Sequence, residues 1–231
     1  MAMKPRQQLK LRLDDLKEIE PMTKNQEKVC KAFGKGDNIV LAGSAGTGKT
    51  FLALGLGLEE VLDKNTPYQK LIVVRSIVPT RDIGFLPGDE EEKKLVYEAP
   101  YIGICANLFG VNDAWEKLKQ SNDVEFMTTS FIRGVTLDDC IIVVDEMQNL
   151  TAHELDSVIT RVGENCRILL CGDYYQSDFH KNNDKDGILK FLEVVSHLTG
   201  FSIIEFNWED IVRSGLVRDY IMTKEQLGVK F

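Results

Sequence analysis

The stretch LAGSAGTGKTFLALGLGL, residues 41–58, joins an apolar run to a long apolar segment through a short loop of small residues. Its centre, Gly43 to Thr50, matches the pattern G-x-x-x-x-G-K-[ST] at every position. An apolar run typical of a strand precedes the motif, and a segment typical of a helix follows it, which is the context of a P-loop. The alternative is a glycine-rich turn that only connects strand to helix, and the complete motif disfavours it.

The chemistry of a nucleoside triphosphate explains these residue types. Glycines let the backbone wrap so that its N–H groups point at phosphate oxygens, and the start of the helix adds a favourable dipole. Lys49 is expected to reach the β and γ phosphates, and the Thr50 hydroxyl to ligate Mg²⁺. The residues predicted to bind the nucleotide are Gly43, Ser44, Ala45, Gly46, Thr47, Gly48, Lys49 and Thr50.

A second motif, IIVVDEMQN, indicates what happens to the nucleotide. Its apolar residues 141–144 place Asp145 at the carboxyl end of a buried strand, where ligands of open α/β sheets bind. Asp145 suits the Walker B role of holding Mg²⁺, and Glu146 is placed to orient and polarise an attacking water. The alternative is an acidic pair that caps the next helix. Beside a complete P-loop we favour hydrolysis.

Two later segments supply further candidates. In LLCGDYYQSD, Gln176 follows another strand and is a candidate sensor of the γ-phosphate or of the attacking water, with a polar turn as the alternative. In WEDIVRSGLVRDY, Arg213 and Arg218 lie on a predicted helix. An arginine can stabilise the charge that develops in phosphoryl transfer, from the same chain or from a neighbouring subunit. Surface arginines in salt bridges are the alternative.

The apolar pattern predicts an α/β fold with a mostly parallel sheet flanked by helices. Short continuous runs rich in Val and Ile fit strands covered on both faces, and the segments between them fit crossover helices. The predicted strands are 38–42, 70–75, 124–129, 140–145, 167–172 and 201–206, and the predicted helices are 49–62, 152–162 and 187–198. Residues 1–20 are expected to form a mobile or loosely attached arm, and residues 21–231 one domain. The segment 81–101 is expected to be a long loop or helical insertion outside the core.

Composition narrows the classes of function. The chain has 231 residues, 43% of them hydrophobic, so it can bury a sizeable core. Its formal net charge of -8 argues against a protein that coats nucleic acid indiscriminately. Its five cysteines form no C-x-x-C pair, which indicates neither zinc nor a disulfide framework. Because no long apolar run is present, we predict a cytoplasmic protein without a membrane span.

In this order, the motifs resemble the PhoH family of P-loop ATPases, which is similar to the first motor domain of superfamily 1 helicases. The segments that carry the resemblance are TKNQEKV, which contains Gln26, the P-loop, GFLPGD at 84–89, RGVTLDDCIIVVDEMQNLT at 133–151, TRVGENCRILLCGDYYQSD at 160–178 and EDIVRSGLVRDY at 209–220. The resemblance covers residues from about Thr23 to about Tyr220. It implies a RecA-like, helicase-like P-loop NTPase fold.

The resemblance also implies ligands and roles. ATP with Mg²⁺ is the expected cofactor, Gln26 recognises adenine, Gln176 couples the nucleotide to motion, and Arg213 contacts phosphate. Family members are described as ring-forming, and one motor domain is too little for translocation, so a homo-hexamer is expected. The arginine borrowed from a neighbour would then be one of Arg161, Arg213 and Arg218.

Nucleic acid, either RNA or single-stranded DNA, is the expected partner by this resemblance. Residues in loops after strands or in the insertion are candidates for contacts with phosphate and sugar: Arg75, Arg81, Lys93, Lys94, Thr128, Thr129 and Arg133. Interleaved aromatic residues are candidates for stacking on bases: Phe85, Tyr97, Tyr101 and Phe131. Two alternatives stay open. One is a nucleotide-switched assembly ATPase that acts on a protein, and the other is a small-molecule kinase.

Overall fold

A single parallel sheet organises the molecule. The computed structural model describes residues 10–76, 90–132, 134–173 and 182–229, without the side chains of 90–94 and 182–186. Its strands are β1 (Asn38–Gly43), β2 (Lys70–Arg75), β3 (Val124–Thr128), β4 (Cys140–Val144), β5 (Arg167–Gly172) and β6 (Phe201–Phe206). They are ordered β3-β2-β4-β5-β1-β6, and each pairing is parallel. The predicted fold class is confirmed, and the predicted strand bounds agree to within one residue.

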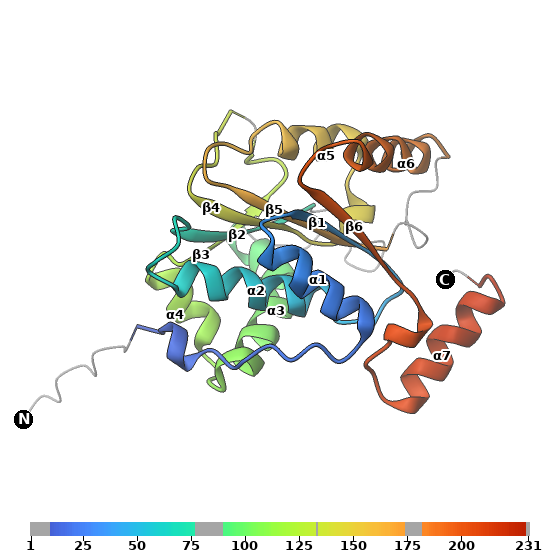
Figure 1. Cartoon of the computed structure of the whole chain (residues 1–231), viewed down its shortest axis with the longest axis horizontal. Helices are drawn as coiled ribbons and strands as arrows, with labels where there is room; N and C mark the ends of the chain where they lie inside the picture. Colours follow the sequence, from blue (N-terminus) through green and yellow to red (C-terminus); the bar gives the residue numbers. More distant parts are fainter. Residues whose placement is uncertain (1–9, 77–89, 133, 174–181, 230–231) are drawn as a thin grey trace, which may run out of the picture.

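Helices cover both faces of this sheet (Figure 1). One face carries α1 (Lys24–Gly34), α2 (Lys49–Leu62), α3 (Glu90–Phe109) and α4 (Ala114–Gln120), and the other carries α5 (Ala152–Ile159) and α6 (Asn182–Ser196). The last helix, α7 (Gly215–Gln226), follows β6 and lies to one side (Figure 1). Among the described residues, no helix is long and apolar enough to cross a bilayer.

Alternating residues of the strands belong to two separate hydrophobic clusters, one on each face of the sheet. In β1, Ile39 and Leu41 belong to the cluster under α1 to α4, whereas Val40 and Ala42 belong to the cluster under α5 and α6. This division explains why successive residues inside the central strands β1 and β4 are apolar, since both faces of the sheet are covered there.

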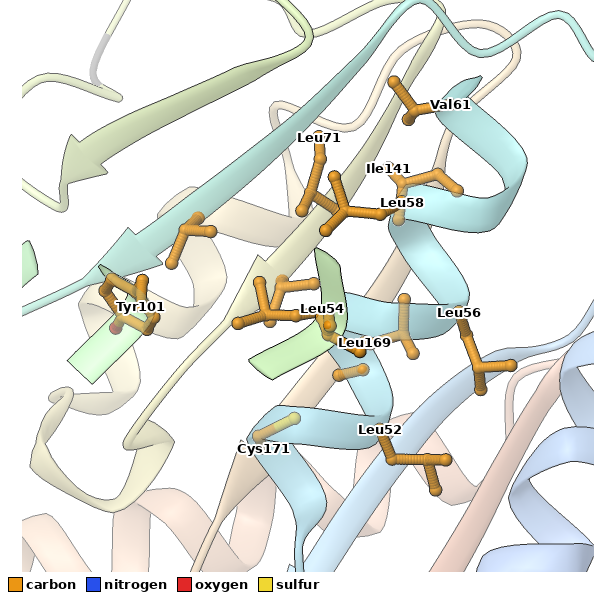
Figure 2. Close-up of a cluster of buried hydrophobic side chains, with 14 of the residues drawn as sticks. Leu52, Leu54, Leu56, Leu58, Val61, Leu71, Tyr101, Ile141, Leu169 and Cys171 are labelled. Atoms are coloured by element: carbon orange, nitrogen blue, oxygen red, sulfur yellow. The ribbon is translucent and has the colours of Figure 1, made fainter. Parts of the chain in front are cut away.

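The helix that follows the P-loop, α2, is the central helix of the larger cluster. Residues 52–58 of α2 are all buried, as expected for a helix that is apolar all round. Figure 2 shows its leucines packed against Leu71, Ile141 and Leu169 of three different strands. At Gly57 an added Cβ would lie 2.5 Å from Leu71 Cδ1, so this glycine lets the helix approach the sheet closely. The P-loop is therefore anchored at both ends in the core.

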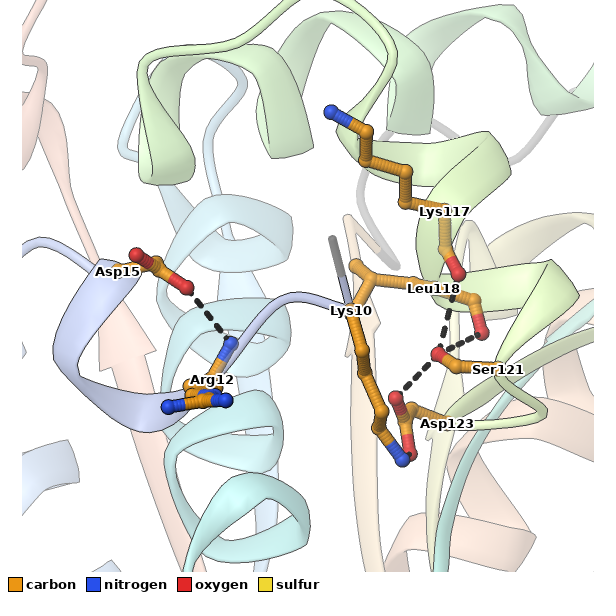
Figure 3. Close-up of polar contacts among 7 residues, drawn as sticks. All are labelled: Lys10, Arg12, Asp15, Lys117, Leu118, Ser121 and Asp123. Carbon is orange, nitrogen blue, oxygen red and sulfur yellow. Dashed lines mark hydrogen bonds and ion pairs between the residues drawn. The ribbon is translucent and has the colours of Figure 1, made fainter. Parts of the chain in front are cut away.

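The segment 10–20 is more firmly attached than the sequence indicated. Leu11 is buried, and Ile19 packs so closely on α2 that a Cβ at Gly55 would lie 2.2 Å from Ile19 Cδ1. Lys10 Nζ lies 3.0 Å from Asp123 Oδ1, in the polar cluster of Figure 3. Residues 10–20 are therefore not loosely attached, because the side chains of Leu11, Leu16 and Ile19 pack against the core.

The predicted insertion, 81–101, is only partly described. Residues 81–89 lie outside the described ranges, and α3 begins at Glu90 and continues to Phe109. Its later part belongs to the core, because Glu98, Tyr101 and Cys105 are buried at helical spacing. The expectation that the whole segment lies outside the core is wrong, since the helical period that places Tyr101 in the interior continues beyond the end of that segment.

Candidate active site

The P-loop has the shape of an anion-binding turn. Gly43 passes so close to β6 that a Cβ there would lie 2.0 Å from the Phe206 carbonyl oxygen, so only glycine fits. Gly48 precedes α2 with φ 81°, a left-handed conformation that glycine adopts without strain. The first N–H groups of α2 have no partner within the helix. They directly follow the loop, whose residue Ala45 is exposed, so a ligand can approach this part of the chain. The backbone thus fits a phosphate group.

Lys49 directs its ammonium group back over the loop. Its Nζ donates hydrogen bonds to the carbonyl oxygens of Gly43 at 2.8 Å and Ser44 at 2.7 Å. Burial lowers the pKa of Lys49, and the nearby carboxylates of Asp173 and Asp145 oppose that shift. A phosphate oxygen can replace a carbonyl as the acceptor, and its charge would favour the protonated amine.

Thr50 and Asp145 meet beside the loop. The Thr50 hydroxyl donates to Asp145 Oδ1 at 2.7 Å, although one residue lies in the first turn of α2 and the other directly follows β4. The Asp145 carboxylate is only 4% exposed, and its second oxygen, Oδ2, accepts a hydrogen bond of 2.9 Å from the Tyr101 hydroxyl. Hydroxyl and carboxylate oxygens are the ligands that Mg²⁺ prefers, so this pair fits the predicted metal.

Glu146 is held in an unusual backbone conformation. Its φ of 52° and ψ of 46° are left-handed, which is uncommon for a residue other than glycine. The Gln148 side-chain amide donates to Glu146 Oε2, while Gln148 Oε1 accepts from the Asp173 N–H at 3.0 Å. Gln148 therefore ties the loop after β4 to the loop after β5. Sequence reasoning missed this residue, although it lies inside the same DEMQN motif.

Two residues assigned by resemblance also reach the P-loop. Gln26 is 6% exposed, and its Nε2 donates to the Thr47 carbonyl at 3.0 Å while its Oε1 accepts from the Met22 N–H at 2.7 Å. A Cβ at Gly46 would lie 2.9 Å from Arg213 Cγ of the same chain. Gln26 thus supports the loop, and its contact with adenine stays a prediction. Arg213 covers the loop from outside.

The remaining site candidates are Gln176, Arg218 and Arg161. Gln176 falls outside the described residues. Arg218 is exposed on α7. Arg161 follows α5, and its carbonyl accepts from the Leu137 N–H at 2.9 Å, close to the start of β4. Arg161 therefore lies near the amino-terminal ends of the strands, whereas the P-loop lies at their carboxyl-terminal ends.

Several predicted nucleic-acid contacts are buried instead. Thr128 is 1% exposed, and Thr129 donates its hydroxyl to Glu154 Oε1 at 2.6 Å. Tyr101 has no exposed surface, so it cannot stack on a base. These three predictions are wrong, because the ends of β3 and the middle of α3 face the interior.

Other candidates stay accessible or undescribed. The Phe131 side chain is 49% exposed, and the Arg75 guanidinium lies 5.9 Å from the centre of the Tyr97 ring. The side chains that fall outside the description are Arg81, Phe85, Lys93, Lys94 and Arg133.

The C-terminal helix also touches the P-loop, a contact that the sequence did not indicate. Ser44 Oγ donates to Glu225 Oε2 at 3.2 Å, and the Trp208 indole N–H donates to the same oxygen. These residues border an open pocket of about 440 Å³ together with Asn207 and Glu209.

Comparison with known proteins identifies the family. The model of the family described as PhoH-like protein matches residues 18–224. The chain belongs to the PhoH-like protein family. The predicted family is thus confirmed, and the P-loop and DEMQN motifs of this PhoH-like protein lie within the matched range.

Curated relatives of this PhoH-like protein are longer. A PhoH-like protein of Bacillus subtilis (strain 168) is 33% identical over 206 residues, which are 89% of this chain and 63% of the relative. Protein PhoH of Escherichia coli (strain K12) is 31% identical over 188 residues, 80% of this chain and 52% of the relative. The chain thus spans less than two thirds of the length of these relatives.

Solved structures with some similarity to this chain include a phage terminase and a helicase. The large terminase from a thermophilic bacteriophage has a TM-score of 0.49 at 14% identity, covering 92% of this chain and 51% of the terminase. Bacteroides Pif1 bound to ssDNA has a TM-score of 0.41 at 17% identity, covering 91% of this chain and 49% of Pif1.

Proposed function

We propose that this PhoH-like protein binds ATP with Mg²⁺ and hydrolyses the bond between its β and γ phosphates. The observation that carries the proposal is the meeting of Thr50 and Asp145 at 2.7 Å beside a P-loop over which the Lys49 ammonium is held. Hydroxyl, carboxylate and ammonium groups are the set that a magnesium nucleotide requires. Because the sheet brings them together at the ends of its strands, they can act on one ligand.

Each residue then has a distinct task in hydrolysis. The loop N–H groups and Lys49 bind the β and γ phosphates, and Thr50 and Asp145 hold the metal. Bound Mg²⁺ would neutralise charge that develops on the phosphate oxygens. Glu146 orients the attacking water and accepts its proton, and Gln148 fixes the direction of that carboxylate. Arg213 contacts phosphate, Gln26 contacts adenine and Gln176 senses the γ-phosphate.

The finer proposal is an oligomeric, cytoplasmic motor on RNA or single-stranded DNA, assembled as a homo-hexameric ring. It is supported by family membership, by the single P-loop in the chain, by Arg75 at the end of β2 and by the exposed Phe131 after β3. The net charge of -8 and the burial of Thr128 and Tyr101 favour a second candidate. That candidate is a nucleotide-switched assembly ATPase that acts on a protein partner without nucleic acid.

A hydrolysis assay distinguishes the two. ATP turnover is measured with and without single-stranded RNA or DNA, together with the mass in solution in the presence of a non-hydrolysable analogue. Stimulation by one polymer in a ring-sized species, weakening as salt rises, supports the motor. Turnover that neither polymer changes favours the assembly ATPase.

A matched pair of lysine variants tests the site itself. Lys49→Ala should abolish nucleotide binding or turnover, whereas Lys31→Ala should leave both unchanged. Lys31 forms only an exposed pair with Glu27 on α1. Unchanged turnover in Lys49→Ala would contradict the P-loop assignment.

A further inference from the structure

Tyr101 touches the candidate metal site from a part of the chain that none of the motifs includes. It lies in the middle of α3, has no exposed surface, and donates its hydroxyl to Asp145 Oδ2 at 2.9 Å. Its ring packs against Trp115 and Phe126, with centroids 5.6 and 5.8 Å away. The hydroxyl is therefore held in place by packing on both sides.

Both oxygens of the Asp145 carboxylate are thereby fixed by side chains. Oδ1 faces the Thr50 hydroxyl and Oδ2 faces the Tyr101 hydroxyl. Because the carboxylate is almost completely buried, loss of either donor leaves an oxygen without compensation for its lost water. Outer partners of this kind orient the ligands of a metal ion.

Tyr101 is in turn linked to the end of β2. The Arg75 guanidinium lies 5.9 Å from the centre of the ring of Tyr97, one helical turn earlier in α3, and its positive charge interacts with Tyr101. On the opposite side, the buried Glu98 accepts hydrogen bonds of 2.7 Å from Trp115 and Lys119 of α4. This arrangement holds α3 between β2 and α4.

We propose that Tyr101 is a positioning residue for the metal site, and that Arg75 supports it, so that a chain of contacts runs from the end of β2 to Asp145. The inference rests on the proposed function and deepens it. The ligand concerned is the divalent cation that accompanies the nucleotide. Tyr101 contacts the carboxylate and neither the cation nor the phosphates.

The test is a magnesium titration of nucleotide binding, which does not depend on turnover. A fluorescent ADP analogue is added to the full chain, and binding is followed as MgCl₂ increases. In Tyr101→Phe the Mg²⁺ concentration at half-maximal binding should rise about tenfold, while binding in EDTA stays as in the wild type. The variant keeps the ring, so its thermal melting shows that the fold persists.

Phe126→Leu is the matched control, because it loosens the packing around the same ring but leaves the hydroxyl. Its magnesium midpoint should stay near the wild-type value. An unchanged midpoint in Tyr101→Phe, or an equal rise in Phe126→Leu, would overturn the inference. If the wild type bound no analogue at any Mg²⁺ concentration, the proposed function itself would fail along with the inference.

The contribution of Arg75 is tested by combining variants. Arg75→Gln should raise the midpoint by less than Tyr101→Phe does. The double variant should show no further rise beyond Tyr101→Phe alone, because residues in one chain of contacts are not additive. Fully additive effects would overturn the link between Arg75 and Tyr101.

Discussion

Glu146 illustrates how single residues are constrained at this site. Its left-handed backbone costs about 1 kcal/mol or more in a residue with a side chain. The Gln148 amide and the hydrogen bond of 2.9 Å from the Asn149 N–H to the Glu146 carbonyl hold that conformation. The turn separates the partly exposed Glu146 from the buried Asp145 that precedes it, so adjacent carboxylates can serve different tasks.

Replacing the Glu146 carboxylate by an amide should separate binding from hydrolysis. Glu146→Gln keeps the shape of the side chain but removes the proton acceptor, so nucleotide binding should persist while turnover falls about 10²-fold or more. Binding is measured by titration and turnover by phosphate release. Glu164→Gln, a change at an exposed position, is the control. Normal turnover in Glu146→Gln would assign its role to another residue.

The sequence predicted the placement of those candidate residues that belong to a local motif. The P-loop positions and Asp145 follow from where a strand ends and a helix begins, and the structure places Lys49, Thr50 and Asp145 together. Tyr101 was assigned to base stacking instead, because it belongs to no motif or strand end and only the packing of α3 brings it into contact with Asp145. The periodicity of a helix or strand in the sequence does not predict such a contact between distant elements.

Among the elements, α5 shows a network that joins the ends of strands to one helix. Thr151 and Glu154 form a capping box at its start, and Glu154 also accepts from Thr129 and, at 3.4 Å, from Ser76. Burial alone would raise the pKa of Glu154, but the hydrogen bonds from Thr129, Thr151 and Ser76 together outweigh it, and its pKa is lowered. The ionised carboxylate therefore stabilises the fold.

Glu154→Gln should reduce stability in a way that depends on pH. A carboxyl group whose pKa is lowered on folding contributes its stability above the unfolded-state value, 4.5, and loses that contribution as pH falls through the folded-state value. At pH 7 the variant should lose about 1 kcal/mol of unfolding free energy, the size of a capping interaction. Urea titrations should show this difference shrinking below about pH 4.5, whereas the exposed Glu193→Gln should show none. A pH-independent difference would argue against the ionised cap.

Element bounds were predictable where burial is continuous. The strands and α2 follow from unbroken apolar runs, and their bounds agree closely. By contrast, α6 begins at Asn182, five residues before the predicted start, because its first turn is polar and lacks an apolar period. The 20-residue helix α3 was not predicted either, because its start is acidic and it contains Pro100. Tertiary packing stabilises this helix although its local sequence disfavours one.

At the scale of the whole molecule, each chain has one nucleotide site. In the proposed ring, a neighbouring subunit could add an arginine to that site. Arg213 serves the site of its own chain, because its side chain lies against Gly46 of that P-loop. The Val212 N–H also donates to the Gly46 carbonyl at 3.1 Å. Arg218 is exposed on α7, a helix with no buried residue, so it is free to face a neighbouring subunit.

Mixing inactive variants tests which arginine crosses between subunits. Arg213→Ala mixed with Lys49→Ala should remain inactive, because an arginine that acts on its own loop cannot be supplied by a neighbour. Arg218→Ala mixed with Lys49→Ala should regain part of the ATP turnover, since a Lys49→Ala subunit can offer Arg218 to an adjacent intact P-loop. Turnover is measured over a range of mixing ratios. Recovery in the Arg213 mixture would place that arginine in the neighbour's site, and recovery in neither mixture would exclude both Arg213 and Arg218 as the arginine that a neighbour supplies.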